Sequence, residues 1–130
     1  MKIQQCEIIL YVADQQKSRD FYSAVLQKIP DIDVPGMTEF TLSNELKLGL
    51  MPENGIAKIL LDKTPHPKTG NGIPRCELYL LVDNTVEAYS DTLKAGAREI
   101  SSIQDRDWGD RVGYLADPDG HIIAFAERIQ

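Results

Sequence analysis

The sequence predicts an α+β fold made of two βαβββ modules, and three observations predict it. The nine residues that begin at Cys6 recur, with similar chemistry, seventy residues later at Cys76. Each copy leads into a segment with the periodicity of an amphipathic helix. Each helical segment is followed by three short stretches of strand character. The expected order is therefore strand, helix and three strands, twice.

The first module opens with an apolar strand that ends at Asp14, a residue type that caps helices. We expect a helix from about Gln15 to Lys28, with an apolar side formed by Phe21, Tyr22, Val25, Leu26 and Ile29. Short strands are then expected at Ile32–Val34, Thr38–Leu42 and Leu46–Met51. The last two are joined by a turn at residues 43–45.

The second module repeats this order. Asn84 and Glu87 have capping-box spacing, and the helix they begin is expected to turn Val86, Tyr89 and Leu93 inward and to end near Gly96. The strands that follow are expected at Glu99–Ile103, Arg111–Ala116 and Ile122–Ala126. The residues Asp117-Pro118-Asp119-Gly120 predict a tight turn between the last two strands.

We expect a single domain over residues 1–130, made of a module at 1–52, a linker at 53–74 and a module at 75–130. Pro, Gly and Lys are common between Pro52 and Arg75, which favours an irregular connection. Ile56–Leu61 is the apolar exception, and it is expected to form an extra strand or a helical turn.

Composition excludes several classes of function. Fourteen basic and twenty acidic residues give a net charge of −6, which disfavours nucleic acid as a partner. The longest apolar run, Ile8–Ala13, is far shorter than the roughly 20 residues of a membrane-spanning helix. No secretory signal is expected after Lys2, so we expect a cytoplasmic protein in which Cys6 and Cys76 are small, buried thiols.

The paired openings Glu-Ile-Ile-Leu-Tyr-Val-Ala-Asp and Glu-Leu-Tyr-Leu-Leu-Val-Asp-Asn carry a family resemblance, together with the Ser18–Leu26 helix. So does Trp108-Gly109-Asp110-Arg111 followed by Asp117-Pro118-Asp119-Gly120-His121. Over essentially its whole length the chain resembles the vicinal oxygen chelate superfamily, the group of glyoxalases, bleomycin-resistance proteins and extradiol dioxygenases. The resemblance implies a cup-shaped, mostly antiparallel sheet with one small-molecule cavity per cup, usually completed by a second subunit. A homodimer is therefore expected.

Strand alternation assigns the faces of the two opening strands. Ile8, Leu10 and Val12 are expected to face a helix, as are Leu78, Leu80 and Val82. Glu7 and Tyr11, and the repeat-related Glu77 and Tyr79, are then expected to face the cup.

The resemblance also implies four repeat-related positions at which metal-dependent members place a ligand. Here these positions hold Glu7, Gly49, Glu77 and Ala124, and only the two glutamates carry donor atoms. Carboxylates and water suit Mg²⁺, Mn²⁺ or Ca²⁺ better than transition metals that prefer imidazole or thiolate. We therefore expect no resident metal, and a weak divalent ion stays open as an alternative. His66 and His121 are interpreted as structural or solvent-exposed, and the Asp117–Gly120 cluster as a turn rather than a cation site.

The candidate ligand-binding residues are Tyr11, Lys47, Gly49, Tyr79, Trp108 and Ala124. Trp108 is the strongest functional candidate among the aromatic residues, because it lies in a polar loop where core burial does not explain it. Lys47 shares a strand face with Gly49 and is a candidate partner for the inward glutamates.

Two functions follow as hypotheses. The first is a small-molecule-binding protein that holds an organic ligand in an aromatic-lined cup without an obligatory transition metal. The second is a glyoxalase-like lyase or isomerase in which Glu7 and Glu77 act as acid and base or as weak divalent-metal ligands. A purely structural or protein-interaction module is a third possibility.

Overall fold

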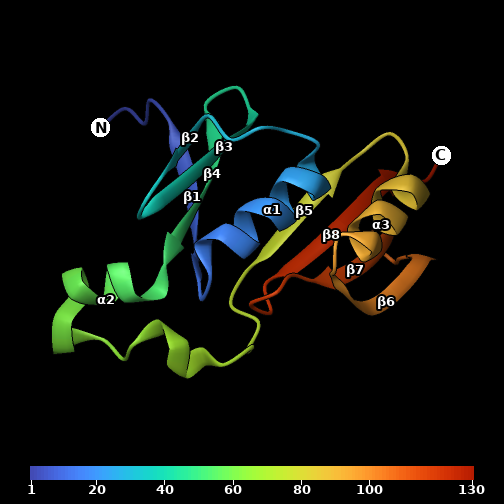
Figure 1. The fold of residues 1–130 in the computed structure, drawn as a ribbon. Helices are drawn as coiled ribbons and strands as arrows, with labels where there is room; N and C mark the ends of the chain where they lie inside the picture. The colour runs from blue at the N-terminus through green and yellow to red at the C-terminus, as the bar shows by residue number, and fades with distance from the viewer. The chain divides into compact units, whose positions relative to one another are not determined.

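The computed structural model describes residues 1–130 and divides them into two compact units, Met1–Gly70 and Asn71–Gln130. Each unit contains a strand, a helix and three further strands, and the first unit adds a second helix after its last strand (Figure 1). The predicted α+β class and the βαβββ order are therefore confirmed. No helix is long and apolar enough to span a lipid bilayer.

The first unit contains a four-stranded sheet in the order β1-β4-β3-β2. Its elements are β1 (Cys6–Val12), α1 (Gln15–Leu26), β2 (Ile32–Val34), β3 (Met37–Ser43) and β4 (Leu46–Pro52). The crossover through α1 makes β1 and β4 parallel, whereas the other two pairings are antiparallel. The short turn after Ser43 places β3 beside β4, and the register shifts there between Thr41 and Ser43.

Helix α1 covers one face of this sheet through contacts with β4 and β3. The Asp14 side chain accepts a hydrogen bond from the Lys17 backbone and so caps the helix, as predicted. Phe21 and Tyr22 are buried with their rings edge to face, 5.0 Å between centroids. Beneath them lie Leu10, Val12, Phe40, Leu48 and Leu50 on the alternate positions of the strands. The other face of the sheet is therefore free to carry polar side chains.

The second unit repeats the topology with strand order β5-β8-β7-β6. Its elements are β5 (Glu77–Leu81), α3 (Thr85–Lys94), β6 (Arg98–Asp105), β7 (Asp110–Ala116) and β8 (Ile122–Arg128). Helix α3 packs on β7, β8 and β6. Asn84 caps this helix by accepting a hydrogen bond from the Glu87 backbone, as the capping-box spacing predicted.

The connection between the modules is more regular than predicted. It contains helix α2 (Glu53–Leu60) and two short 3₁₀ helices, η1 (Leu61–Lys63) and η2 (Pro67–Gly70). Of the two alternatives for Ile56–Leu61, the structure contains the helix, and Ile56 is its buried residue. Helix α2 contacts β4 and β1 of the first unit.

Four expectations of burial were wrong. Helix α1 ends at Leu26 because Gln27 adopts a left-handed conformation, so Ile29 lies beyond it and is 89% exposed. Val86 is 67% exposed, because α3 turns Thr85, Tyr89 and Thr92 inward instead. Cys6 is exposed at the start of an edge strand, and Cys76 is only half-buried.

Candidate functional site

A polar cluster lies on the face of the first sheet opposite α1. Glu7 on β1 is the register partner of Lys47 on β4, and Gly49, two residues further along β4, is the register partner of Glu39 on β3. Strand alternation places all four residues on one face, because Thr38, next to Glu39, bonds to Gln15 of α1 on the other. The predicted site residues Glu7, Lys47 and Gly49 are therefore neighbours, and Glu39 joins them.

Lys47 pairs with Glu39 rather than with Glu7. Its Nζ lies 2.8 Å from Glu39 Oε1, and the Glu39 side chain is almost fully buried. The sequence made Lys47 a candidate partner for the inward glutamates Glu7 and Glu77. Its ion pair is with Glu39 instead, and its charge also acts on Glu7. The register explains the difference, because β3 and β4 form a hairpin that directs Glu39 and Lys47 toward each other.

The two carboxyl groups of the cluster have opposite tendencies to hold a proton. Burial raises the pKa of Glu7, and a hydrogen bond to Glu39 and the negative charge of Glu39 raise it further. The pKa of Glu39 is lowered, first by the hydrogen bond from Lys47 and then by the one from Glu7. Pairing with Glu39 raises the pKa of Lys47. Of the two carboxyl groups, Glu7 therefore holds a proton more readily than Glu39.

Because Gly49 has no side chain, the carboxyl group of Glu7 can lie close to the backbone of β4. A Cβ atom at this position would lie 3.3 Å from Glu7 Oε2, 3.2 Å from Ile9 and 3.3 Å from the sulfur of Met37. Glu7 Oε2 is itself buried and meets no hydrogen-bond donor. The absence of a side chain at Gly49 therefore lets a buried carboxyl oxygen lie against the strand.

The second unit carries a chain of four hydrogen-bonded side chains. The indole N–H of Trp108 donates to the Tyr79 hydroxyl at 2.8 Å, and that hydroxyl donates to Asp110 Oδ2 at 2.6 Å. Arg128 donates to both oxygens of Asp110, at 3.0 and 3.2 Å. Asp110 and Arg128 are register partners on β7 and β8, and Tyr79 projects from β5. Three strands thus fix the orientation of one loop tryptophan.

The hydrogen bonds in this series of side chains stabilise a protonated Tyr79 and an ionised Asp110. The bond from Tyr79 and the pairing with Arg128 lower the pKa of Asp110, which is almost fully buried. Burial and the bond to Asp110 raise the pKa of Tyr79, so its hydroxyl keeps the proton it donates. Trp108 nevertheless remains 57% exposed. The arrangement presents a flat, oriented aromatic surface to solvent.

The remaining predicted residues occupy separate places. Tyr11 is half-buried near the end of β1, on the same strand face as Glu7. Ala124 is fully buried as the register partner of Tyr79 and belongs to a small apolar cluster with Val112 and Ala126. Glu77 is exposed at the start of β5, and its negative charge raises the pKa of Tyr114.

The residues at the four implied metal positions do not fit a transition metal. Glycine and alanine supply no side-chain ligand at positions 49 and 124, and the space beside Gly49 is in contact with Glu7, Ile9 and Met37. Glu7 already shares a hydrogen bond with Glu39. A set with two carboxylates and no imidazole or thiolate lacks the donors that such metals select.

A second group of potential metal ligands, Asp117, Asp119 and His121, lies at the turn between β7 and β8, with its ligand atoms within 4.8 Å of one another. These atoms already have partners. Asp117 Oδ1 accepts the backbone N–H groups of Asp119 and His121, and its Oδ2 lies 3.0 Å from His121 Nδ1. Arg75 Nη2 lies 3.2 Å from the other ring nitrogen of this buried histidine. The interpretation as a self-capped turn therefore agrees with the geometry.

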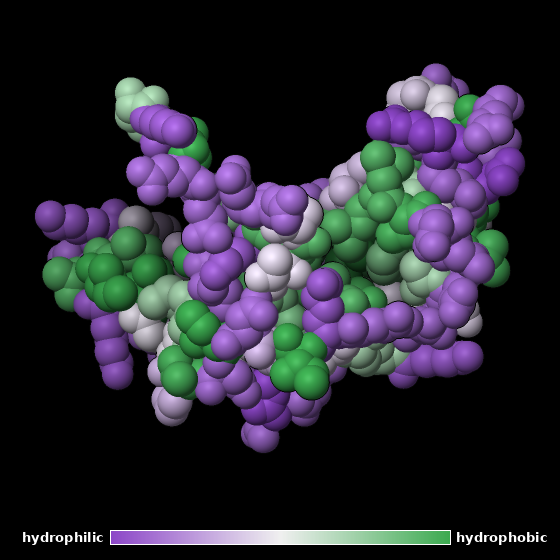
Figure 2. All heavy atoms as spheres, turned by 90° about the horizontal axis from the view of Figure 1, so that it is seen from above, coloured by the Kyte–Doolittle hydropathy of each residue, from purple (hydrophilic) through white to green (hydrophobic).

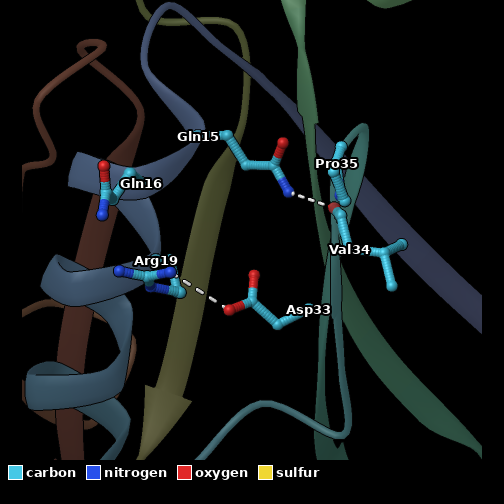
Figure 3. Close-up of a pocket in the computed structure, with 6 residues that line it drawn as sticks. All are labelled: Gln15, Gln16, Arg19, Asp33, Val34 and Pro35. Atoms are coloured by element: carbon cyan, nitrogen blue, oxygen red, sulfur yellow. Dashed lines mark hydrogen bonds and ion pairs between the residues drawn. The ribbon is translucent and has the colours of Figure 1, made fainter.

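A cleft of about 280 Å³ lies between α1 and the β2–β3 turn (Figure 3). Gln15 donates to the Val34 carbonyl at 2.8 Å and accepts from the Gly36 backbone at 3.0 Å, and Arg19 pairs with Asp33 at 3.1 Å. These polar groups connect the helix to the turn. The cleft is on the helix side of the sheet, away from Glu7 and Lys47, and we interpret it as structural.

Sequence reasoning missed Glu39, Asp110 and Arg128. Glu39 had a usable signal, because it alternates with the apolar Phe40 in a strand and therefore faces away from the core. Asp110 is a nearly buried carboxylate at a strand start, and only the register of β7 with β8 reveals its partner Arg128.

Comparison with known proteins places this geometry in context. Residues 5–130 match the family described as glyoxalase-like domain. A glyoxalase-related enzyme from Fulvimarina pelagi has a TM-score of 0.80 at 22% identity, covering 96% of this chain and 88% of its own. A glyoxalase/bleomycin resistance protein/dioxygenase family enzyme from Burkholderia phytofirmans PsJN has a TM-score of 0.80 at 14% identity, covering 95% and 97%. An uncharacterized protein of Mycobacterium bovis is 29% identical, over 93% of this chain and 81% of that protein. At these identities the structural likenesses show the fold.

Proposed function

Because the chain belongs to the glyoxalase-like domain family, we propose that it binds a small organic molecule without an obligatory transition metal. The observation that carries this proposal is the oriented, exposed indole of Trp108. More than half of Trp108 is exposed, and a hydrogen bond that fixes the orientation of its ring lowers the entropy lost when a planar ligand stacks on it.

The surroundings of Trp108 support an aromatic contact. Tyr79, at 37% exposure, is fixed through the same hydrogen bonds and offers further aromatic surface. The Tyr79 hydroxyl already donates to Asp110 and accepts from Trp108, so the two rings contribute mainly apolar contact. Apolar side chains also reach the protein surface in several places (Figure 2).

The residues at the implied metal-ligand positions support the proposal that no transition metal is obligatory. Gly49 and Ala124 supply no ligand where metal-dependent members of the superfamily place one. Lys47 also brings a positive charge to the face that carries Glu7. A protein of this kind would hold its ligand stoichiometrically.

The single tryptophan makes a direct test possible. We expect planar compounds such as acetophenone, benzoate and benzylamine, titrated in a buffer with a strong chelator, to include at least one that changes Trp108 emission saturably. Tyr79→Phe removes the hydroxyl that accepts from the indole, and we expect it to weaken that binding about tenfold. Val86→Ala, on the exposed side of α3, is the matched control and should leave binding unchanged.

Three results would contradict the proposal of stoichiometric, metal-independent binding, two of them from binding measurements. One is an affinity that is the same in the native protein and in Tyr79→Phe, measured by calorimetry. The other is binding that disappears in the chelator and returns with a stoichiometric metal ion. Chemical conversion of a bound compound with turnover would also count against stoichiometric binding.

The environment of Glu7 favours a second candidate function, a lyase or isomerase of the glyoxalase type. In this candidate function, Glu7 and Glu77 act as acid and base or as weak ligands of a divalent ion. A carboxyl group with a raised pKa is suited to proton transfer near neutral pH. Turnover that survives both Glu7→Gln and Glu77→Gln would exclude this mechanism, because neither amide accepts a proton.

We also propose that the protein is a homodimer. Each four-stranded sheet leaves its outer strands unpaired along one edge, β1 and β2 in the first and β5 and β6 in the second. Sedimentation that shows a stable monomer at micromolar concentration would contradict this proposal.

A further inference from the structure

One arginine beside Trp108 has hydrogen-bond donors that the fold does not use. Arg128, at the end of β8, is the register partner of Asp110 at the start of β7. Its Nη1 donates to both oxygens of Asp110, at 3.0 and 3.2 Å. Its Nε and Nη2 make no hydrogen bond, and its side chain is 69% exposed. The N–H groups of these two nitrogens are therefore available to a ligand.

The loop that carries Trp108 is fixed to the same end of the sheet. The backbone N–H of Ile129 donates to the carbonyl of Gly109 at 3.0 Å, so the residue after Arg128 is bonded to the residue after Trp108. The side chains are linked as well. The Tyr79 hydroxyl accepts from the indole and donates to the carboxylate that holds the guanidinium. The indole and the guanidinium therefore belong to one hydrogen-bonded group.

This group has its negative charge inside and its positive charge outside. The Asp110 side chain is 2% exposed, and its two oxygens accept from Tyr79 and Arg128. The guanidinium, by contrast, lies largely in solvent. A ligand on the indole of Trp108 is therefore closer in character to a partner for the guanidinium than for the buried carboxylate. The planar fork of N–H groups in a guanidinium matches the two oxygens of a carboxylate ligand.

Asp107 is the acid that would favour a cationic ligand instead, since it is exposed next to Trp108. No hydrogen bond or ion pair holds its side chain, so binding a cation there would cost the entropy of ordering it. Asp105, the other exposed acid nearby, already pairs with Arg111 at 2.8 Å. Arg128 is ordered before a ligand arrives, because Asp110 holds it. The contacts therefore favour an anionic ligand.

We infer that Arg128 binds the carboxylate group of a planar aromatic acid whose ring stacks on Trp108. This inference rests on the proposed small-molecule binding and names the class of ligand. The proton of the Tyr79 hydroxyl is used by Asp110, so the aromatic residues contribute apolar contact and Arg128 supplies the polar recognition. Asp110 is a positioning residue, since it acts by holding Arg128 and Tyr79.

The first experiment compares ligands of similar shape and different charge. Benzoate, its neutral counterpart benzamide and the cation benzylamine are titrated against Trp108 emission in the native protein. We expect benzoate to bind about tenfold more tightly than benzamide, because its hydrogen bonds to Arg128 are charge-assisted, and benzylamine to bind most weakly. Added salt should narrow the difference. Equal affinities for benzoate and benzamide, or a preference for benzylamine, would overturn the inference.

Two variants test whether Arg128 causes that preference. Arg128→Gln leaves an amide that can donate to Asp110 and removes the positive charge, and we expect it to abolish the preference for benzoate. Arg128→Lys should keep part of it. If Arg128 only supported the loop, its loss would weaken benzoate and benzamide equally and leave their ratio unchanged, which would contradict the inference.

Arg98→Gln is the matched control. It removes the same charge from an exposed residue of the same unit, and its register partner Ala116 lies at the opposite end of β7 from Asp110. We expect this variant to keep the native preference for benzoate. A loss of preference as large as in Arg128→Gln would show that the net charge of the protein, and not a site at Arg128, selects the anion, and would overturn the inference.

The second experiment examines Arg128 without an aromatic ligand. The NMR signal of the Arg128 Nε–H group, assigned by its loss in Arg128→Gln, is followed during titration with sodium acetate, with sodium chloride at equal ionic strength as the reference. We expect a saturable shift that acetate causes and chloride does not, and no such shift at Arg98. The absence of a saturable shift at Arg128 would overturn the inference.

The two experiments separate this inference from the proposed function. If acetate shifts the Arg128 signal but no aromatic compound binds, the proposed function fails and the carboxylate site at Arg128 stands. If benzoate and benzamide change Trp108 emission with equal affinity, the proposed function stands and the inference fails.

Discussion

At the scale of single residues, the position of Glu39 changes the interpretation of Glu7. From the sequence, Glu7 was paired in function with Glu77, its counterpart in the repeat. In the structure, Glu7 has a neighbouring carboxyl group on the same sheet, that of Glu39, and Glu39 pairs with Lys47. The repeat identified the face of the strand that carries Glu7. It did not reveal Glu39 as a neighbour, because a neighbour across a sheet depends on hairpin register.

The raised pKa of Glu7 predicts how stability depends on pH. A carboxyl group whose pKa is higher in the folded state contributes stability that is complete below its ordinary value of 4.5 and is lost as the pH rises through the folded value. Glu39, whose pKa is lowered, contributes in the opposite sense: its share is present above 4.5 and is lost as the pH falls through the folded value.

We therefore expect Glu7→Gln to gain stability relative to the native protein as the pH rises from about 4 to about 8. Urea unfolding of both proteins at several pH values measures this difference. Glu77→Gln, which makes the same chemical change at an exposed strand position, is the control. If the free energy of unfolding of Glu7→Gln runs parallel to that of the native protein over this pH range, folding does not raise the pKa of Glu7, and the prediction is wrong.

At the scale of elements, the sequence predicted the starts of helices better than their ends. Asp14 and Asn84 cap α1 and α3 as expected, because a capping side chain acts within three residues. The end of α1 depends on a left-handed Gln27, which no residue type at that position signals. The prediction that Val86 lies on the inward face of α3 was wrong, because the helix buries Thr85 and Thr92 on that face instead.

Gly113 shows how closely α3 packs on its sheet. A Cβ atom on this β7 residue would lie 2.7 Å from the Tyr89 ring and 2.8 Å from Ile103. We expect Gly113→Ala to lower the free energy of unfolding by about 1–3 kcal/mol, since the core must shift to admit the methyl group. Denaturant unfolding measures this loss.

The matched control for that substitution is Gly55→Ala in helix α2. There the nearest atom to a new Cβ is Pro52 Cβ at 3.9 Å, so the methyl group meets no obstacle. We expect an unchanged or higher stability, by up to about 1 kcal/mol, from the better helix propensity of alanine. Equal effects of the two substitutions would show that space around Gly113 is not the cause.

At the scale of the whole molecule, the repeat and the closing turn were enough to predict the fold. Seventy-residue periodicity fixed the order of elements in both units, and the family match over residues 5–130 agrees with it. The candidate site was predictable only in part. Trp108 was found because an aromatic residue in a polar loop is unusual, whereas the Tyr79–Asp110–Arg128 support became visible only when the strands were in register.

At the same scale, the first unit carries a polar cluster on its sheet and the second unit carries an oriented aromatic surface. The positive charge of the polar cluster on the first sheet is that of Lys47, and the aromatic residues of the second unit are held by Asp110 and Arg128. Metal independence is therefore the central claim, since it separates a ligand-binding role from metal-assisted chemistry.

Elemental analysis of protein purified without chelators or a metal-affinity tag tests this claim most directly. The account predicts no metal in stoichiometric amount, and no thermal stabilisation by Mg²⁺, Mn²⁺, Ni²⁺, Zn²⁺ or Fe²⁺. One metal ion per chain, with a stabilisation that disappears in Glu7→Gln or Glu77→Gln, would contradict it.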